Sequence, residues 1–301
     1  MKINNQSDFL QQLRKQLEFV IQNCPYLNMP VDLNMPSKQN NSTLAEIIIS
    51  SFDNSSFRRA LSIMPFVEFG VAIELFQNAA LIHDDIIDKA LTRRGQKSIP
   101  VILGSARALL VANILYSLAF ERFLTAAKRV KGVQNYALDK IVWQWWQVFD
   151  LVQAGQILDF ELANYKLVYG QFELIEQKIE QVIWQKTTSY TFILPAQIRS
   201  FASNKPALSN PEIKQLQTDG LAFQMQNDFD NVFPADNKVT KDQLSDIYNR
   251  KKTLLLIATL KKLPKVTAQS IIDLYNSDKV INYQTALFIK GAMAKANKVP
   301  N

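Results

Sequence analysis

Three aspartates, Asp84, Asp85 and Asp88, fall within the short segment LIHDDIID, directly after an apolar stretch. On a helix, Asp84 and Asp88 would share one face, with Asp85 about 100° further round the axis. Like charges at this spacing repel, and the helix macrodipole adds negative charge at the C-terminal end. We therefore expect a cation there. Mg²⁺ fits best, because it prefers oxygen ligands and commonly joins carboxylates to substrate phosphates; the alternative is a solvated acidic helix end.

Two arginines and a second polar cluster favour the metal interpretation. Arg93 and Arg94 follow the aspartates, and paired guanidinium groups suit bidentate contacts with phosphate. Further along the chain, the segment GLAFQMQNDFDN places Asn227 and Asp228 among other polar residues. By itself, this second cluster would indicate a helix end that leads into a loop.

Composition limits the class of protein. The chain has 301 residues, is 48% hydrophobic and carries a net charge of +7, so it can fill a sizeable core and suits acidic partners. Its single cysteine excludes an intramolecular disulfide. The N-terminal segment lacks the apolar centre of a signal peptide, and the longest apolar run, 108–120, is too short to cross a bilayer. We therefore expect a cytoplasmic protein without a transmembrane segment.

Apolar spacing predicts helices along the whole chain and no run of strand-like alternation. One helix, from about 65 to 89, would carry the three aspartates, and another would begin at Ser7 as its N-cap. Further helices are expected at 105–129, 134–164, 171–200, 211–230, 251–263, 267–276 and 281–296. Because no repeat or composition shift marks a boundary, we predict one all-α domain over residues 1–301.

Trp143, Trp146 and Phe149 recur on one face of a predicted helix. No basic stripe alternates with these aromatic residues, which favours packing in the core or at a subunit interface over base stacking. We expect no nucleic-acid partner.

Six blocks in a fixed order resemble the trans-prenyltransferases, or polyprenyl diphosphate synthases, over nearly the whole chain. The first block resembles the family's first aspartate-rich motif with its arginine pair. The blocks are HDDIIDKALTRRG (83–95), GQILDF (155–160), KTTSY (186–190), GLAFQ (220–224), KDQLSD (241–246) and RKKTLL (250–255). Six blocks in order are much more specific than any one. The resemblance implies a bundle of long, mostly antiparallel helices around a central cavity.

The resemblance also implies a reaction between an allylic diphosphate and isopentenyl diphosphate. Mg²⁺ ions, about two or three per site, would be held by both acidic clusters and help the allylic diphosphate to leave. The double bond of isopentenyl diphosphate would attack the resulting cation, and a proton would be lost. Cations stabilise charge on the leaving diphosphate, and apolar walls keep water from the allylic cation. The expected partners are a second copy of the chain or a homologous subunit, and a membrane surface for product release.

The family's functional residues carry over by position in three groups. The implied metal ligands are Asp84, Asp85, Asp88, Asn227 and Asp228. The allylic diphosphate would contact Arg93, Lys186 and Lys241, with Lys251 close by, and isopentenyl diphosphate would contact Arg94, Arg59 and Gln77. The reacting end would be lined by Thr187 and Gln224 and oriented by Gln156 and Asp159.

Four departures from the family pattern keep other functions open. The block NSSFRRA (54–60) keeps only Arg59 of a basic trio, and Gln77 stands where the family often has histidine. Asn227 replaces an aspartate, and Ala112-Asn113 replaces a Gly-Asp pair. These changes predict weaker binding of isopentenyl diphosphate and of a third metal. A non-catalytic or regulatory subunit, or a class I terpene cyclase, are therefore the alternatives.

Product length should depend on the helix that carries the first motif. In the family, residues four and five before the first aspartate form the first floor of the product tunnel, and here both are small, Ala80 and Ala79. Phe76 would lie one turn deeper, about 5.4 Å along the axis. We therefore expect a product of about twenty carbons or more. The alternative is that both alanines merely allow close helix packing and Phe76 is ordinary core.

Overall fold

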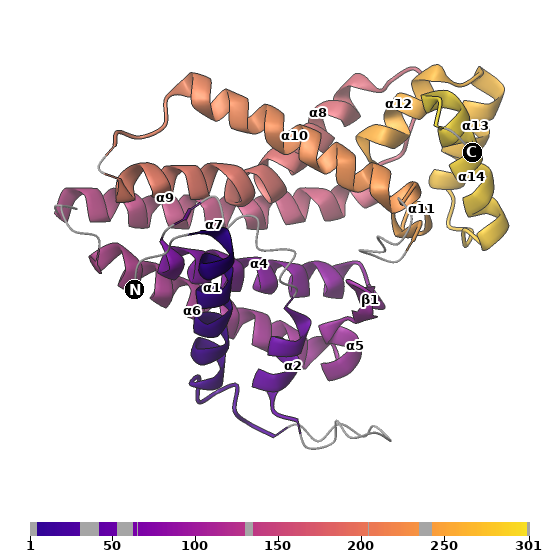
Figure 1. Cartoon of the computed structure of the whole chain (residues 1–301). Coiled ribbons are helices and arrows are strands. Elements are labelled where there is room, and N and C mark those ends of the chain that lie inside the picture. The colour runs from indigo at the N-terminus through magenta and orange to yellow at the C-terminus, as the bar shows by residue number, and fades with distance from the viewer. Residues whose placement is uncertain are drawn as a thin grey trace. The chain divides into compact units, whose positions relative to one another are not determined.

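The computed structural model (Figure 1) describes residues 5–30, 42–52, 63–64, 66–129, 135–203, 205–234 and 243–299. The regular secondary structure of these residues is almost entirely helical, which confirms the all-α prediction. The chain divides into two compact units, Met1–Val148 with Tyr190–Ile213, and Phe149–Ser189 with Lys214–Asn301. We call them unit 1 and unit 2 and describe each by itself. The expectation of one domain stays a prediction.

Unit 1 is built around a central helix, α4. This helix is apolar round most of its circumference and packs against α1, α5 and α6. The elements wholly within the unit are α1 (Gln6–Gln22), α2 (Leu44–Ser51), α4 (Val67–Ile87), β1 (Thr92–Arg93), β2 (Gln96–Lys97), α5 (Ile99–Leu103), α6 (Ser105–Arg129) and α9 (Leu194–Ala202). Three further elements cross the unit boundaries, namely α7 (Asn135–Asn164), η3 (Ile183–Ile193) and α10 (Asn210–Val232).

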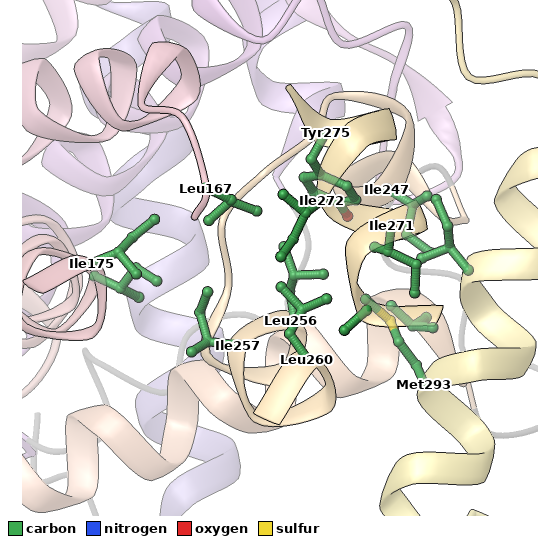
Figure 2. Close-up of a cluster of buried hydrophobic side chains, with 14 of the residues drawn as sticks. Leu167, Ile175, Ile247, Leu256, Ile257, Leu260, Ile271, Ile272, Tyr275 and Met293 are labelled. Atoms are coloured by element: carbon green, nitrogen blue, oxygen red, sulfur yellow. The ribbon is translucent and has the colours of Figure 1, made fainter. Parts of the chain in front are cut away.

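Unit 2 has its own hydrophobic core, part of which is drawn in Figure 2. Isoleucines and leucines from several short helices converge there, among them Leu256, Ile257 and Leu260 on one face of α12. The elements wholly within this unit are α8 (Glu173–Val182), α11 (Ser245–Tyr248), α12 (Leu254–Lys262), α13 (Lys265–Tyr275) and α14 (Tyr283–Asn297). The side chain of Thr253 accepts from Leu256 N and caps α12 at its start.

Several sequence-based boundaries need correction. The N-cap of α1 is Asn5, whose side chain accepts from Asp8 N at 2.9 Å, and not Ser7, which lies inside the helix. The helix predicted over 171–200 is three successive elements, because a π-helix, η3, separates α8 from α9. The short helices α2 and α5 and the β1–β2 hairpin were not predicted, since each is too short to show a periodic pattern.

Among the described helices, α6 alone has the length and hydropathy of a segment that could cross a membrane. Its buried residues, which include Val111, Leu115 and Ala119, pack on α4. Core helices of globular proteins show the same composition. The composition of α6 therefore does not contradict the prediction that no segment spans a membrane.

Candidate active site

The acidic segment forms the C-terminal end of α4. Asp84 and Asp85 are buried, and Asp88 is half-buried at the C-cap, where its backbone N–H donates to the Asp84 carbonyl at 2.8 Å. Two buried carboxylates in one turn need compensating positive charge.

Arg93 supplies that charge in this structure. Its Nε donates to Asp85 Oδ1 at 2.9 Å, and its Nη2 donates to Asp84 Oδ2 at 3.2 Å and also to Asp85. Burial disfavours the charged guanidinium, but the charges of Asp85 and Asp84 outweigh burial and raise the pKa of Arg93 above its ordinary value. Arg93, which the sequence assigned to a diphosphate, therefore also organises the aspartates.

A two-residue hairpin turn determines where Arg93 and Arg94 lie. Thr92 pairs with Lys97 and Arg93 with Gln96, so that Arg94 and Gly95 form the turn, with φ of 55° and 76°. Two successive positive φ values are typical of a type I′ turn, whose twist matches that of the flanking strands. Glycine adopts this conformation freely, whereas arginine seldom does. The sequence placed Gly95 beyond the helix but did not reveal the unusual conformation of Arg94.

The residue before the aspartates, His83, contacts α6. Its side chain hydrogen-bonds Asn113, and its ring lies 5.4 Å from that of Tyr116. Burial lowers the pKa of His83, and the hydrogen bond to Asn113 opposes this shift only in part. The Asn113 amide therefore stands beside the His83 imidazole, at the position where the family pattern has a carboxylate.

The donor set at the end of α4 fits Mg²⁺ in its chemistry. Asp84 and Asp88 offer carboxylate oxygens one helical turn apart, and Arg93 already stands where positive charge is needed. Within the described residues, no group of three or more histidine, cysteine, aspartate or glutamate side chains is arranged to hold a metal ion. Any Mg²⁺ bound there would therefore also need oxygen ligands from a bound substrate or from water.

A lysine cluster in unit 2 is organised by a single carboxylate. Asp159 Oδ2 on α7 accepts from Lys186 Nζ at 2.6 Å and lies 3.8 Å from Lys251 Nζ. Lys186 lies on η3, which approaches α7 closely at Gly155, where a Cβ would come within 2.6 Å of the Lys186 backbone nitrogen. The blocks GQILDF, KTTSY and RKKTLL, far apart in the sequence, therefore meet at one place, and Gln156 is half-buried in the first of them.

A series of side-chain hydrogen bonds in unit 2 joins η3 to α10. Thr187 Oγ1 donates to Gln224 Oε1 at 3.3 Å, and Gln224 Nε2 donates to Asp228 Oδ1 at 2.8 Å. Asp228 is buried, whereas Asn227 is exposed. The two predicted metal ligands of this segment thus differ in environment, and the buried carboxylate is held by Gln224.

Two residues that were not among the predicted site residues link the elements of unit 2. Asn231 donates to Ser245 Oγ at 2.9 Å and accepts from Asp246 N at 3.1 Å, so it ties the start of α11 to α10. Lys252, next to Lys251, is buried and donates to the Ala163 carbonyl near the end of α7. Burial, and to a smaller extent the charge of Arg250, lower the pKa of Lys252 to about 8. The block RKKTLL contains no signal that one lysine of the pair turns inward, because both stand in a run of three basic residues.

The residues predicted to limit product length lie in an aromatic cluster of unit 1. Phe76 is buried, and its ring centroid lies 5.0 Å from that of Tyr116, 5.5 Å from that of Trp145 and 5.6 Å from that of Tyr190. These rings come from α6, α7 and η3. Ala79 is fully buried on α4, and Ala80 is half-buried.

The remaining predicted residues fall into two groups. Gln77 is buried in α4, while its neighbour Asn78 lines a pocket together with Arg94. Arg59, with the block 54–60, and Lys241 lie outside the described residues.

Comparison with known proteins decides the family. A model of the polyprenyl synthetase family matches residues 26–287. The chain belongs to this family. It is 28% identical over 210 residues to the short chain isoprenyl diphosphate synthase of Methanocaldococcus jannaschii, a match that covers 69% of this chain and 60% of that protein.

Further relatives agree with this family. The geranylgeranyl diphosphate synthase of Sulfolobus acidocaldarius is 30% identical over 200 residues, 64% of this chain and 56% of that protein. The chain therefore spans about 60% of the length of the curated relatives it matches.

Among solved structures, the farnesyl diphosphate synthase of T. brucei in complex with risedronate has a TM-score of 0.75 at 16% identity, over 97% of this chain and 87% of that one. The geranylgeranyl pyrophosphate synthase of Corynebacterium glutamicum, in complex with isoprenyl diphosphate and magnesium, has a TM-score of 0.72 at 20% identity, over 97% and 87%. At these identities the likeness is one of fold.

Proposed function

We propose that this polyprenyl synthetase family member condenses isopentenyl diphosphate with an allylic prenyl diphosphate to give an all-trans prenyl diphosphate, in a reaction that depends on Mg²⁺. The observation that carries the proposal is the end of α4, where buried aspartates and Arg93 form one organised charged group. A buried charged group of this kind is seldom retained for stability alone.

Each cluster has a distinct role in this proposal. Mg²⁺ held by Asp84 and Asp88 would offset the charge of the departing allylic diphosphate. Lys186 and Lys251, held by Asp159, bind and orient that diphosphate. When the allylic carbon–oxygen bond breaks, its electron pair leaves with the diphosphate. The double bond of isopentenyl diphosphate then forms the new carbon–carbon bond, and loss of a proton restores a double bond.

We also propose a product of about twenty carbons or more. The small side chains of Ala79 and Ala80 leave the first floor of the expected tunnel open, and the ring of Phe76 lies about one helical turn, 5.4 Å, deeper. Because three further aromatic rings support Phe76, it would form a firm end to that space.

A direct elongation assay tests the proposed reaction. Purified protein with Mg²⁺, labelled isopentenyl diphosphate and allylic primers of several lengths should give labelled prenyl diphosphates, which are sized by chromatography. Release of a hydrocarbon or alcohol from an allylic diphosphate alone would instead indicate a terpene cyclase.

One specific observation favours a second candidate, a non-catalytic or regulatory subunit. Asn227 is neutral and exposed where the family pattern has a charged metal ligand. The basic block at 54–60 is also reduced to Arg59 and its neighbour Arg58. Elongation that appears only when a homologous subunit is added would support this second candidate over the first.

We propose a homodimer formed through α6 and α7. Trp143 and Trp146 are 65% and 42% exposed, and Leu110 on α6 is 62% exposed. Exposed tryptophan and leucine side chains on α6 and on the part of α7 that belongs to unit 1 suit an interface. Trp143→Glu should therefore shift the protein from dimer to monomer in light scattering, whereas Val266→Glu, at another exposed apolar position, should not. A monomeric wild-type protein would contradict the proposal.

A further inference from the structure

A pocket of about 740 Å³ in unit 1 lies among α1, the end of α2, α4, the β1–β2 hairpin and the start of α5. Its volume is typical of a site for a small ligand. The side chain of Arg94, which the family resemblance assigns to isopentenyl diphosphate, lines this pocket. Arg14 and Glu18 of α1 line it too, although α1 carries none of the family blocks.

Arg14 is held in a defined position at the wall of this pocket. Its Nη1 donates to the Phe52 carbonyl at 3.1 Å, and its Nη2 donates to the Ile49 carbonyl at 3.2 Å. Both carbonyls lie at the C-terminal end of α2, where the helix macrodipole is negative and favours a cation. Its Nε also donates to Glu18, four residues along α1. The guanidinium is thus preorganised, and the side chain as a whole is 25% exposed.

The charges that line the pocket favour an anion. Four cationic residues line it, against two acidic ones, and Asp85 is paired with Arg93 and Glu18 with Arg14. The cationic residues are Arg14, Arg93, Arg94 and Lys97. In the sequence, Ser56 and Phe57 stand where the family has a lysine and an arginine for the diphosphate of isopentenyl diphosphate. The pocket therefore has a cation from α1, and the sequence lacks two cations of the usual block.

We propose that Arg14 is a binding residue for the diphosphate of isopentenyl diphosphate, and that Glu18 weakens the affinity of this pocket for anions. This inference rests on the proposed function, because it takes isopentenyl diphosphate as the ligand. Arginine suits this role, since its planar donors match phosphate oxygens and its charge persists at all working pH values.

Binding of isopentenyl diphosphate alone, measured by calorimetry without an allylic partner and without metal, tests the inference apart from turnover. Arg14→Ala should weaken binding about tenfold or more, as expected for the loss of charge-assisted hydrogen bonds. Arg14→Lys should restore part of the affinity. Lys15→Ala, an exposed neighbour on the same helix, is the matched control and should bind as the wild-type protein does.

Glu18→Gln distinguishes a binding role from a purely structural one. If Arg14 binds the diphosphate, removal of the competing carboxylate should tighten binding several-fold, because like charges repel. If Arg14 only secures α2, loss of its Glu18 partner should weaken binding or leave it unchanged, and that result would overturn the inference. No binding by the wild-type protein would overturn it as well. Binding without any elongation would instead count against the proposed function and leave the role of Arg14 intact.

Discussion

At the scale of single residues, the three aspartates at the end of α4 have different surroundings. Asp85 is buried and takes two bonds from Arg93, whereas Asp88 is half-buried at the helix end. The sequence treats the three carboxylates as one motif. Helical spacing sets Asp85 apart from Asp84 and Asp88, which share a face. The pairing of Asp85 with Arg93 depends on how the β1–β2 hairpin returns Arg93 to α4, which no local pattern reveals.

Asp88→Asn and Asp85→Asn should therefore fail in different ways. Asp88→Asn should abolish elongation at saturating Mg²⁺ and leave the free energy of unfolding nearly unchanged, because it removes one of several like charges. Asp85→Asn should lower the free energy of unfolding by about 2–4 kcal/mol, since it leaves the buried positive charge of Arg93 with less negative charge beside it. Urea denaturation of both variants, beside the elongation assay, checks this. Full activity of Asp88→Asn would refute the metal assignment.

Lys252 should make stability depend on pH. Burial lowers its pKa in the folded chain to about 8, against about 10.4 for an unfolded lysine. Between these values the unfolded chain binds more protons than the folded chain, so stability should rise as pH rises. The slope from this group is at most about 1.4 kcal/mol per pH unit.

Urea denaturation between roughly pH 8 and 10 measures this slope. Lys252→Met should remove the rise, because methionine does not titrate. The buried hydroxyl of Tyr275, whose pKa burial raises, acts in the opposite direction only at higher pH. An equal slope in wild-type protein and variant would mean that Lys252 is not buried.

At the scale of elements, the π-helix η3 determines where Lys186 and Thr187 lie. Its neighbours approach it through glycines: Gly155 on α7, and Gly220 on α10. A Cβ at position 220 would lie 2.1 Å from Thr188 Oγ1, and Thr188 is fully buried. The glycines of GQILDF and GLAFQ are thus explained by close packing rather than by turns. The sequence predicted a continuous helix here, because apolar spacing does not distinguish a wider helical turn.

Gly220→Ala should lower the free energy of unfolding by about 1–3 kcal/mol, because the added methyl group overpacks a buried contact. It should also reduce elongation, since Thr188 is next in sequence to Thr187, whose hydroxyl donates a hydrogen bond to Gln224. Gly291→Ala on α14 is the control. A Cβ there meets nothing within 4 Å, so this change should stabilise the protein by about 0.5–1 kcal/mol. Thermal unfolding of both variants measures the difference, and equal shifts would contradict the packing argument.

At the scale of the whole molecule, the long helices were predictable and their long-range contacts were not. The bounds of α6 are those predicted, and α7 begins one residue later than expected, because their apolar periodicity is strong. The order of blocks also indicated which segments share a function. It did not reveal that Arg93 pairs with Asp85, that Lys252 turns inward, or that α1 borders a pocket of cationic residues. Each of these depends on side chains that meet only in the folded chain.

We predict that product length depends on aromatic rings that four elements of the chain bring together. Phe76 on α4 is surrounded by Tyr116, Trp145 and Tyr190, so its orientation is fixed by partners that are distant in the sequence. If a growing prenyl chain runs along α4 and ends at this cluster, Phe76→Ala should lengthen the product by one or more isoprene units.

Ala79→Phe should shorten the product, because the new ring would fill the turn that precedes Phe76 on the path of the chain. Sizing the labelled products by chromatography measures both changes. Phe19→Ala, at an exposed position on α1, should leave product length unchanged. Because Phe76 supports three other rings, Phe76→Ala will also create a cavity and lower stability by about 3–5 kcal/mol, so its products are to be measured well below its melting temperature. If Ala79→Phe and Phe76→Ala both give products of wild-type length, the hydrocarbon chain does not follow this side of α4.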